Sequence, residues 1–148
     1  MSNLSFLVSG TQYNGQNMVL SVDPFNPGSG HVLVVNKDPG NKYQLWETID
    51  WLDGYVFQNV ATGQILCAQG GDSPVTMVDK SQVGNHSIWT KGGGSWFALR
   101  PQYNDDQNLN VQGDGPYRPG TRVLTYTWSG GDPNEVWEIQ PVPALVAA

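Results

Sequence analysis

Three tryptophans at similar intervals constrain the fold of this chain more than any other feature of its sequence. Each ends a three-residue segment with a polar residue first and an apolar residue second: Gln44-Leu45-Trp46, Ser87-Ile88-Trp89 and Glu135-Val136-Trp137. The intervals between them are 43 and 48 residues. A valine lies 14 residues before each tryptophan, at Val32, Val75 and Val123. A period of this length predicts a structural unit repeated three times.

Within each repeat, short apolar runs alternate with turn residues. The runs are rich in Val, Tyr, Phe, Thr and Trp, and they are separated by clusters of Gly, Pro, Asn and Asp. No window has the hydrophobic period of a helix. The clearest predicted strands are 31–35, 96–99, 109–111 and 123–127.

About four strands per repeat predict twelve short strands in three pseudo-symmetric repeats, at about 6–50, 55–92 and 96–140. No repeat has enough apolar surface to fold alone, so the three must share one core. The prediction is an all-β fold that closes on itself and forms a single domain over 1–148.

The charge of the chain excludes several classes of partner. The formal net charge is −6, and the seven Lys and Arg residues are scattered, so there is no basic face for nucleic acid or for an anionic membrane. Near the N-terminus the longest apolar run, 6–8, is too short for a signal peptide or a membrane span, and no basic segment precedes it. We therefore expect a cytoplasmic protein.

The residues that usually carry catalysis or bind metals are few. Cys67 is the single cysteine, and with only His31 and His86 beside it the chain has no disulfide and no zinc-ligand spacing. Cys67 lies in the apolar run 65–68, where a free cysteine behaves as a small hydrophobe. The adjacent acids at 105–106 are flanked by amides and are typical of a solvated turn. We expect no metal, no cofactor and no catalytic activity.

The tryptophan segments resemble the ricin-B-like β-trefoil family, whose three repeats each end in Gln-x-Trp. Only the first repeat keeps the strict motif, because Ser87 and Glu135 replace the glutamine in the other two. The segments 122–128 and 132–137 resemble the fungal members in particular. The resemblance extends over about 6–139 and implies a β-trefoil whose core contains Trp46, Trp89 and Trp137.

In that family each repeat can carry its own sugar site, built from a polar residue on the second strand, a platform on the third and an amide three residues before the tryptophan. These positions hold Ser21, Val35 and Tyr43 in the first repeat, Cys67, Val78 and His86 in the second, and Asn110, Tyr126 and Asn134 in the third. Only the third repeat combines two amides with an aromatic ring. The resemblance thus implies a lectin whose best-preserved site lies in the third repeat.

This trio suits a sugar for a physical reason. A carboxamide both donates and accepts, so two of them can bridge adjacent hydroxyls while an aromatic ring covers the apolar C–H face. Asp114 and Trp128 lie near in sequence and are candidates for a further acceptor and a second apolar wall. The alternative is that Asn110, Tyr126 and Asn134 are only strand-end, packing and hairpin residues.

The resemblance implies a galactose- or GalNAc-type preference, with glycans or glycoproteins as partners. The family more often has Asp where Asn110 stands, which leaves the sugar open. One shallow site binds weakly, so a homodimer is the expected way to gain avidity.

A second function stays open, because fungal β-trefoils of similar length also include protease inhibitors with a defensive role. These act on cysteine, serine or aspartic proteases through protruding loops. Two loops here fit that description: 23–30, with Pro24, Phe25 and Asn26, and 113–120, with Tyr117 and Arg118 between two prolines. Stiff loops lose less entropy on docking into a protease cleft.

Overall fold

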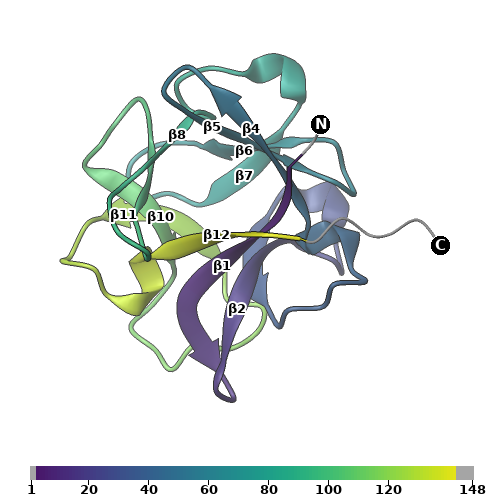
Figure 1. Cartoon of the computed structure of the whole chain (residues 1–148), viewed down its shortest axis with the longest axis vertical. Helices are drawn as coiled ribbons and strands as arrows, with labels where there is room; N and C mark the ends of the chain where they lie inside the picture. The colour runs from purple at the N-terminus through teal and green to yellow at the C-terminus, as the bar shows by residue number, and fades with distance from the viewer. Residues whose placement is uncertain (1–2, 143–148) are drawn as a thin grey trace.

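A computed structural model describes residues 3–142, and within them the chain forms twelve strands and four short 3-10 turns (Figure 1). The strands are β1 (Leu4–Tyr13), β2 (Gln16–Val22), β3 (Val32–Val35), β4 (Trp46–Trp51), β5 (Gly54–Asn59), β6 (Ile65–Ala68), β7 (Val75–Val78), β8 (Trp89–Lys91), β9 (Leu99–Pro101), β10 (Gln107–Val111), β11 (Val123–Thr127) and β12 (Trp137–Pro141). The turns are η1 (Pro27–Ser29), η2 (Lys42–Gln44), η3 (Lys80–Gln82) and η4 (Pro133–Glu135). The predicted all-β class and twelve strands are confirmed.

The first and fourth strands of the repeats close into a ring. β1 pairs with β4 and with β12, β4 with β5, β5 with β8, and β8 with β9. Figure 1 shows β12 beside β1, at opposite ends of the colour scale. Phe97 and Trp137 complete the ring, because their backbone groups exchange hydrogen bonds of 3.0 and 2.8 Å. The first repeat is thereby joined to the last, as a shared core requires.

The second and third strands of each repeat form hairpins, β2–β3, β6–β7 and β10–β11. Three isolated bridges join these hairpins to one another in a triangle: His31 with Thr76, Leu33 with Arg122, and Pro74 with Leu124. Each repeat thus contacts both others through its hairpin as well as through the ring.

The repeated tryptophans link the ring to the hairpins. Trp46, Trp89 and Trp137 are fully buried in one apolar cluster to which all three repeats contribute. Each indole Nε1–H donates to a second-strand carbonyl of its own repeat, at Leu20 (3.0 Å), Leu66 (3.1 Å) and Leu109 (2.8 Å). A buried indole N–H needs an acceptor, and here the acceptor is the same in every repeat.

The constant interval of 14 residues has a structural meaning. Val32, Val75 and Val123 are the first residues of β3, β7 and β11, and the tryptophans are the first residues of β4, β8 and β12. The valines are nearly as buried as the tryptophans. The interval therefore fixes the distance along the chain from the third strand of a repeat to its fourth.

One predicted strand is placed too early. The pattern predicts a strand over 96–99, whereas β9 runs over Leu99–Pro101 and Phe97 forms only an isolated bridge. Trp96 is 39% exposed and does not belong to the core. The three glycines before it allow the chain to turn, and Gly92 N–H bonds the carbonyl of Ala98 at 2.9 Å, so regular pairing with β8 begins only at Leu99.

Candidate functional site

The predicted trio of the third repeat comes from the β10–β11 hairpin and the neighbouring turn η4. In the β10–β11 hairpin, Asn110 pairs with Leu124 and Asn108 pairs with Tyr126. Asn134 lies in η4, immediately before the strand that begins at Trp137. The Asn108 side chain donates to the Glu135 carbonyl at 3.3 Å, which ties η4 to β10. The fold thereby brings Asn134 to Asn110, 24 residues away in sequence.

The two amides contact each other directly. Asn134 Nδ2 donates to Asn110 Oδ1 at 2.9 Å, to the Val111 carbonyl at 3.2 Å and to the Gly113 carbonyl at 3.3 Å. Since all three partners are acceptors, the orientation of the Asn134 amide is determined. Within residues 3–142, Asn110 Nδ2 and Asn134 Oδ1 take part in no hydrogen bond with the protein. The hydrogen-bonded amides therefore keep one donor, on Asn110, and one acceptor, on Asn134, with free capacity.

Around these amides lies a pocket of about 640 Å³. Its further lining residues come from β10–β11, from the loop after β10 and from the loop before η4: Gln112, Gly113, Asp114, Tyr117, Leu124, Tyr126, Ser129, Asp132 and Pro133. Tyr126 is 50% exposed, so its ring is available to a ligand, whereas Asn110 is almost buried. The arrangement is a polar floor beside an accessible aromatic ring, as in many small-molecule sites.

The electrostatics of this pocket are negative. Asp114 and Asp132 line it, and no Lys or Arg does. Burial raises the pKa of Tyr117, and the carboxylates of Asp114 and Asp132 raise it further. The Tyr117 hydroxyl donates to the Gly113 carbonyl at 2.8 Å, which holds the ring against the pocket. Such a pocket favours a neutral or cationic ligand over an anion.

The corresponding positions of the other two repeats are engaged in the protein itself. Ser21 is fully buried, and its hydroxyl donates to the carbonyls of Val22 and Tyr43. Cys67 is buried, with Sγ 3.5 Å from the Ala68 carbonyl. His86 stacks on Tyr103 with ring centroids 3.9 Å apart. These repeats present no pair of amides with free capacity.

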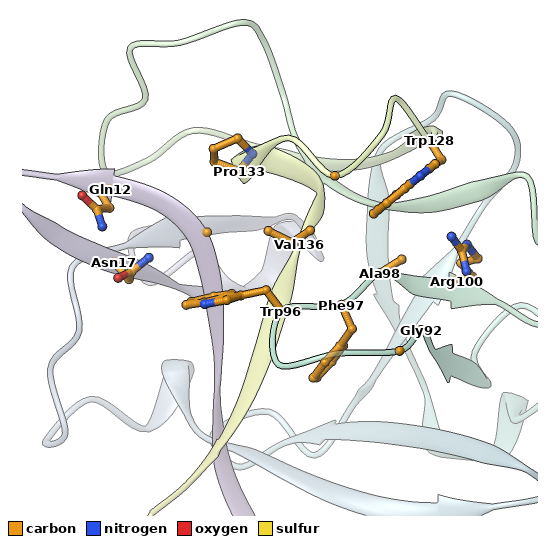
Figure 2. A pocket seen from close by; sticks show the side chains of 13 residues that line it. Gln12, Asn17, Gly92, Trp96, Phe97, Ala98, Arg100, Trp128, Pro133 and Val136 are labelled. Atoms are coloured by element: carbon orange, nitrogen blue, oxygen red, sulfur yellow. The ribbon is translucent and has the colours of Figure 1, made fainter.

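Trp128 does not join the other four predicted residues. It lines a neighbouring pocket of about 710 Å³, together with Trp96, Arg100, Gln12 and Asn17 (Figure 2). Pro133 lines both pockets. Tyr126 and Trp128 are close in sequence, but the chain leaves β11 after Thr127 and turns between the pockets.

The two loops predicted for protease binding differ in their surroundings. In 23–30, the backbone N–H groups of Phe25 and Asn26 donate to Asp23 Oδ1 at 3.0 and 3.3 Å, and the Phe25 side chain is 95% exposed. Pro24 stands between these partners in the sequence. In 113–120, Tyr117 lines the third-repeat pocket, whereas Arg118 is exposed and lines neither pocket.

Some pocket residues were not predicted from the sequence. Gln112, Leu124, Ser129 and Asp132 were missed, although Leu124 lies two residues before Tyr126 on the same strand, where alternation places both on one face. The second pocket was not predicted as a site, although Trp128 was a candidate residue, because its lining residues come from three separate segments of the chain. Among residues 3–142 there is no group of three or more His, Cys, Asp or Glu side chains placed to hold a metal ion. That part of the chain also contains no helix long and apolar enough to cross a membrane.

Comparison with solved structures gives similarities over nearly the whole chain. A designed threefold-symmetric protein, ThreeFoil, matches with a TM-score of 0.78 and 22% identity, over 94% of this chain and 99% of its own. A ricin B-like lectin of Macrolepiota procera in complex with lactose matches with a TM-score of 0.74 and 16% identity, over 95% and 96%. The C-half of an earthworm R-type lectin in complex with GalNAc matches with a TM-score of 0.70 and 18% identity, over 95% and 99%.

The sequence itself matches no protein-family model, and the search of curated proteins finds no match. At these low identities the structural likeness concerns the backbone arrangement: a ring of paired strands, three hairpins and three repeats. The chain has the β-trefoil fold.

Proposed function

We propose that the protein is a lectin that binds a galactose- or GalNAc-type sugar in the third-repeat pocket. Asn110 and Asn134 would bridge two adjacent hydroxyls, Tyr126 would cover the apolar face of the ring, and Asp114 would accept from a further hydroxyl. The proposal is of a binding protein for glycans or glycoproteins, without catalytic activity. A single open pocket predicts a dissociation constant of about a micromolar to a millimolar.

The observation that carries this proposal is the direct hydrogen bond between the two amides. It leaves Asn110 Nδ2 as a donor and Asn134 Oδ1 as an acceptor, beside the half-exposed ring of Tyr126. Adjacent sugar hydroxyls each donate and accept, so they match such a pair. The negative pocket is compatible with a neutral sugar. The solved complexes of two structural neighbours with lactose and GalNAc support the same ligand class.

The test is binding of lactose and of GalNAc by isothermal titration calorimetry, preceded by a glycan array. Asn110→Ala should abolish binding, and Tyr126→Ala should weaken it about 10-fold because the stacking surface is lost. Asn134 keeps its bonds to Val111 and Gly113 in the Asn110→Ala variant, so the fold should persist. Near-UV circular dichroism checks this.

The matched control is Asn36→Ala, because Asn36 is an exposed asparagine that lines neither pocket. Its glycan binding should equal that of the unmodified protein. A glycan array without any ligand for the unmodified protein contradicts the proposal, and so does full binding by the Asn110→Ala variant.

Protease inhibition is the second candidate, and the exposure of Phe25 is the observation in its favour. The Phe25 side chain is 95% exposed, so its whole ring is available to a partner. The loop that presents it is braced by Asp23 and by Ser29, whose hydroxyl donates to the Asn26 carbonyl at 2.8 Å. A braced loop with an apolar tip suits a protease cleft.

Assays against papain-like, trypsin-like and pepsin-like proteases test this candidate. Inhibition that survives Asn110→Ala but is lost in Phe25→Ala or Arg118→Ala would assign the function to the loops. No inhibition of any of the three protease classes would contradict it. The glycan array and the protease assays can be run on one preparation, so sugar binding and protease inhibition are tested independently.

A further inference from the structure

The second pocket is a groove at the junction of the first and third repeats. We call it the Trp96–Trp128 groove. It is lined by the β1–β2 hairpin (Gln12, Asn17), by the segment before and within β9 (Trp96, Arg100) and by the loop before η4 (Trp128). Figure 2 shows Gln12 and Asn17 at one end, beyond Trp96, and Arg100 at the other end, beyond Trp128. Val136 and Ala98 lie between the two indoles. The groove is thus polar at both ends and apolar in the middle.

Both indoles are available to a ligand. Trp96 is 39% exposed and Trp128 is 36% exposed, whereas the three repeated tryptophans are fully buried. Neither indole has a packing role in the main core. Two accessible aromatic rings along one groove present flat apolar surfaces of the kind that cover the C–H face of a pyranose.

The charge of the groove is opposite to that of the third-repeat pocket. Arg100 lines the groove, and no Asp or Glu does. The third-repeat pocket has Asp114 and Asp132 and no cationic side chain. In a chain with 13 acidic and 7 basic residues, a cationic groove without a carboxylate is unexpected. The groove therefore favours an anionic ligand, which the negatively charged third-repeat pocket disfavours.

Arg100 has unused capacity to donate hydrogen bonds. Its guanidinium carbon lies 5.2 Å from the centroid of the Trp128 ring, so the planar group is held over the indole. Its Nε is buried and has no hydrogen-bond partner, so the donors open to a ligand are the two terminal nitrogens, which are not among the buried unpaired atoms of residues 3–142. A positioned guanidinium with free donors is suited to a carboxylate.

We propose that the Trp96–Trp128 groove is a second binding site, for a glycan that carries a carboxylate on one of its sugar rings. The indoles cover the ring faces, the carboxylate meets Arg100, and Gln12 and Asn17 contact hydroxyls at the other end. The class of ligand rests on the carbohydrate binding proposed above, but the site is built from different residues.

The experiment uses the full-length Asn110→Ala variant, in which the third-repeat pocket is disabled. The acidic probes are a disaccharide ending in glucuronic acid and 6′-sialyllactose, which distinguish a uronic from a sialic acid. Their neutral counterparts are the disaccharide ending in glucose and lactose. Calorimetry and tryptophan fluorescence are both recorded, since the exposed indoles report directly on the groove.

At least one acidic probe should bind about 10-fold more tightly than its neutral counterpart, because a charge-assisted bond is added. Raising the salt from about 0.05 M to about 0.5 M should reduce this preference. Arg100→Gln should remove the preference for the acidic probe, and Arg100→Lys should keep part of it. Trp96→Ala should weaken binding of the acidic probe and of its neutral counterpart alike. Should Arg100→Gln fail to fold, Arg100→Lys and Trp96→Phe still test the site.

Two variants serve as matched controls. Arg122→Gln removes the same charge at an exposed arginine outside both pockets, and Trp51→Ala removes an exposed indole outside both. Neither should change the binding of the acidic probes. The proposal is overturned if neither acidic probe binds, if acidic and neutral probes bind equally, or if Arg100→Gln retains the preference. Preferential binding of an apolar peptide with a free carboxylate would assign the groove to a protein partner and also overturn it.

These outcomes are separate from those of the proposed function. If the unmodified protein binds neither lactose nor GalNAc, the proposed sugar site in the third-repeat pocket alone is refuted. If the Asn110→Ala variant shows no preference for the acidic probes over their neutral counterparts, the proposed site in the Trp96–Trp128 groove alone is refuted.

Discussion

At the scale of single residues, the side chain at the first position of the Gln-x-Trp motif matches the hydrogen-bonding groups of the loop that it holds. Gln44 accepts from the Asp38 N–H and donates to the Asn36 carbonyl, which requires an amide. Glu135 instead accepts from three backbone N–H groups, of Ser129, Gly131 and Asp132, so a carboxylate suits it better. The loop held by Glu135 separates the two pockets.

Replacing Glu135 by glutamine should therefore destabilise the protein. The new amide NH₂ would replace one of the two carboxylate oxygens and face a backbone donor, so at least one N–H group of the loop would lose its acceptor, at a cost of about 1–3 kcal/mol. Urea unfolding followed by fluorescence measures this. The control is Glu47→Gln, since Glu47 is partly exposed and its side chain holds no loop; it should change the free energy of unfolding by less than about 0.5 kcal/mol. Equal stabilities of the two variants would refute the assigned role.

The single cysteine gives a prediction about pH. Burial raises the pKa of the Cys67 thiol, so at a given pH less of the reactive thiolate is present than for a free cysteine. Alkylation of the native protein at about pH 8 should be much slower than after unfolding, and the native rate should keep rising at higher pH, above the ordinary cysteine pKa of about 8.5. Mass spectrometry of iodoacetamide-treated samples measures both. Rapid modification of the native protein would show that Cys67 is accessible.

At the scale of elements, the approach of β1 to η4 shapes one wall of the groove. A Cβ atom on Gly10 would lie 2.5 Å from the Pro133 carbonyl oxygen and 2.8 Å from Val136 Cγ2. Gly10 N–H also donates to the Val136 carbonyl at 2.9 Å. Only glycine allows these two backbones to lie so close together.

Gly10→Ala should push η4 away from β1 and destabilise the protein by about 1–3 kcal/mol. Because the shift involves Pro133, which lines both pockets, ligand binding should weaken at both sites. Gly28→Ala is the matched control, since a Cβ there meets nothing within 4 Å. Thermal unfolding and calorimetry of the two variants give the comparison. An unchanged melting temperature for Gly10→Ala would mean that the contact adapts freely.

At the scale of the whole molecule, stability depends on closing the ring. β1 relies on β12, and β8 relies on β9, although these partners belong to different repeats. The main core also takes residues from all three repeats. A fragment of 1–92 would lose β9–β12 and expose the core around Trp46 and Trp89. It should show no cooperative thermal transition, whereas the whole chain should unfold in one step. A folded fragment would show that a repeat pair has its own core.

The sequence alone determined the repeated part of the molecule. The period of the tryptophans predicted three repeats, and the constant 14-residue interval marked where two strands of each repeat begin. The resemblance to the ricin-B-like family supplied the site positions, and comparison of the repeats at those positions pointed to Asn110, Tyr126 and Asn134, which the structure brings to one pocket. The predictions of three repeats and of the strand starts succeed because strand alternation, turn chemistry and internal repetition are local properties that the sequence displays directly.

Only the tertiary structure decided which of the two pockets each loop residue lines. Trp128 follows Tyr126 closely in sequence, yet the loop held by Glu135 turns it into the groove. Trp96 begins a predicted strand but lies exposed beside the β1–β2 hairpin, and Arg100 is held over Trp128. The physical reason is that ring closure brings the β1–β2 hairpin beside Trp96, which lies 79 residues after Asn17 in the sequence, and no local pattern encodes which loop faces meet there.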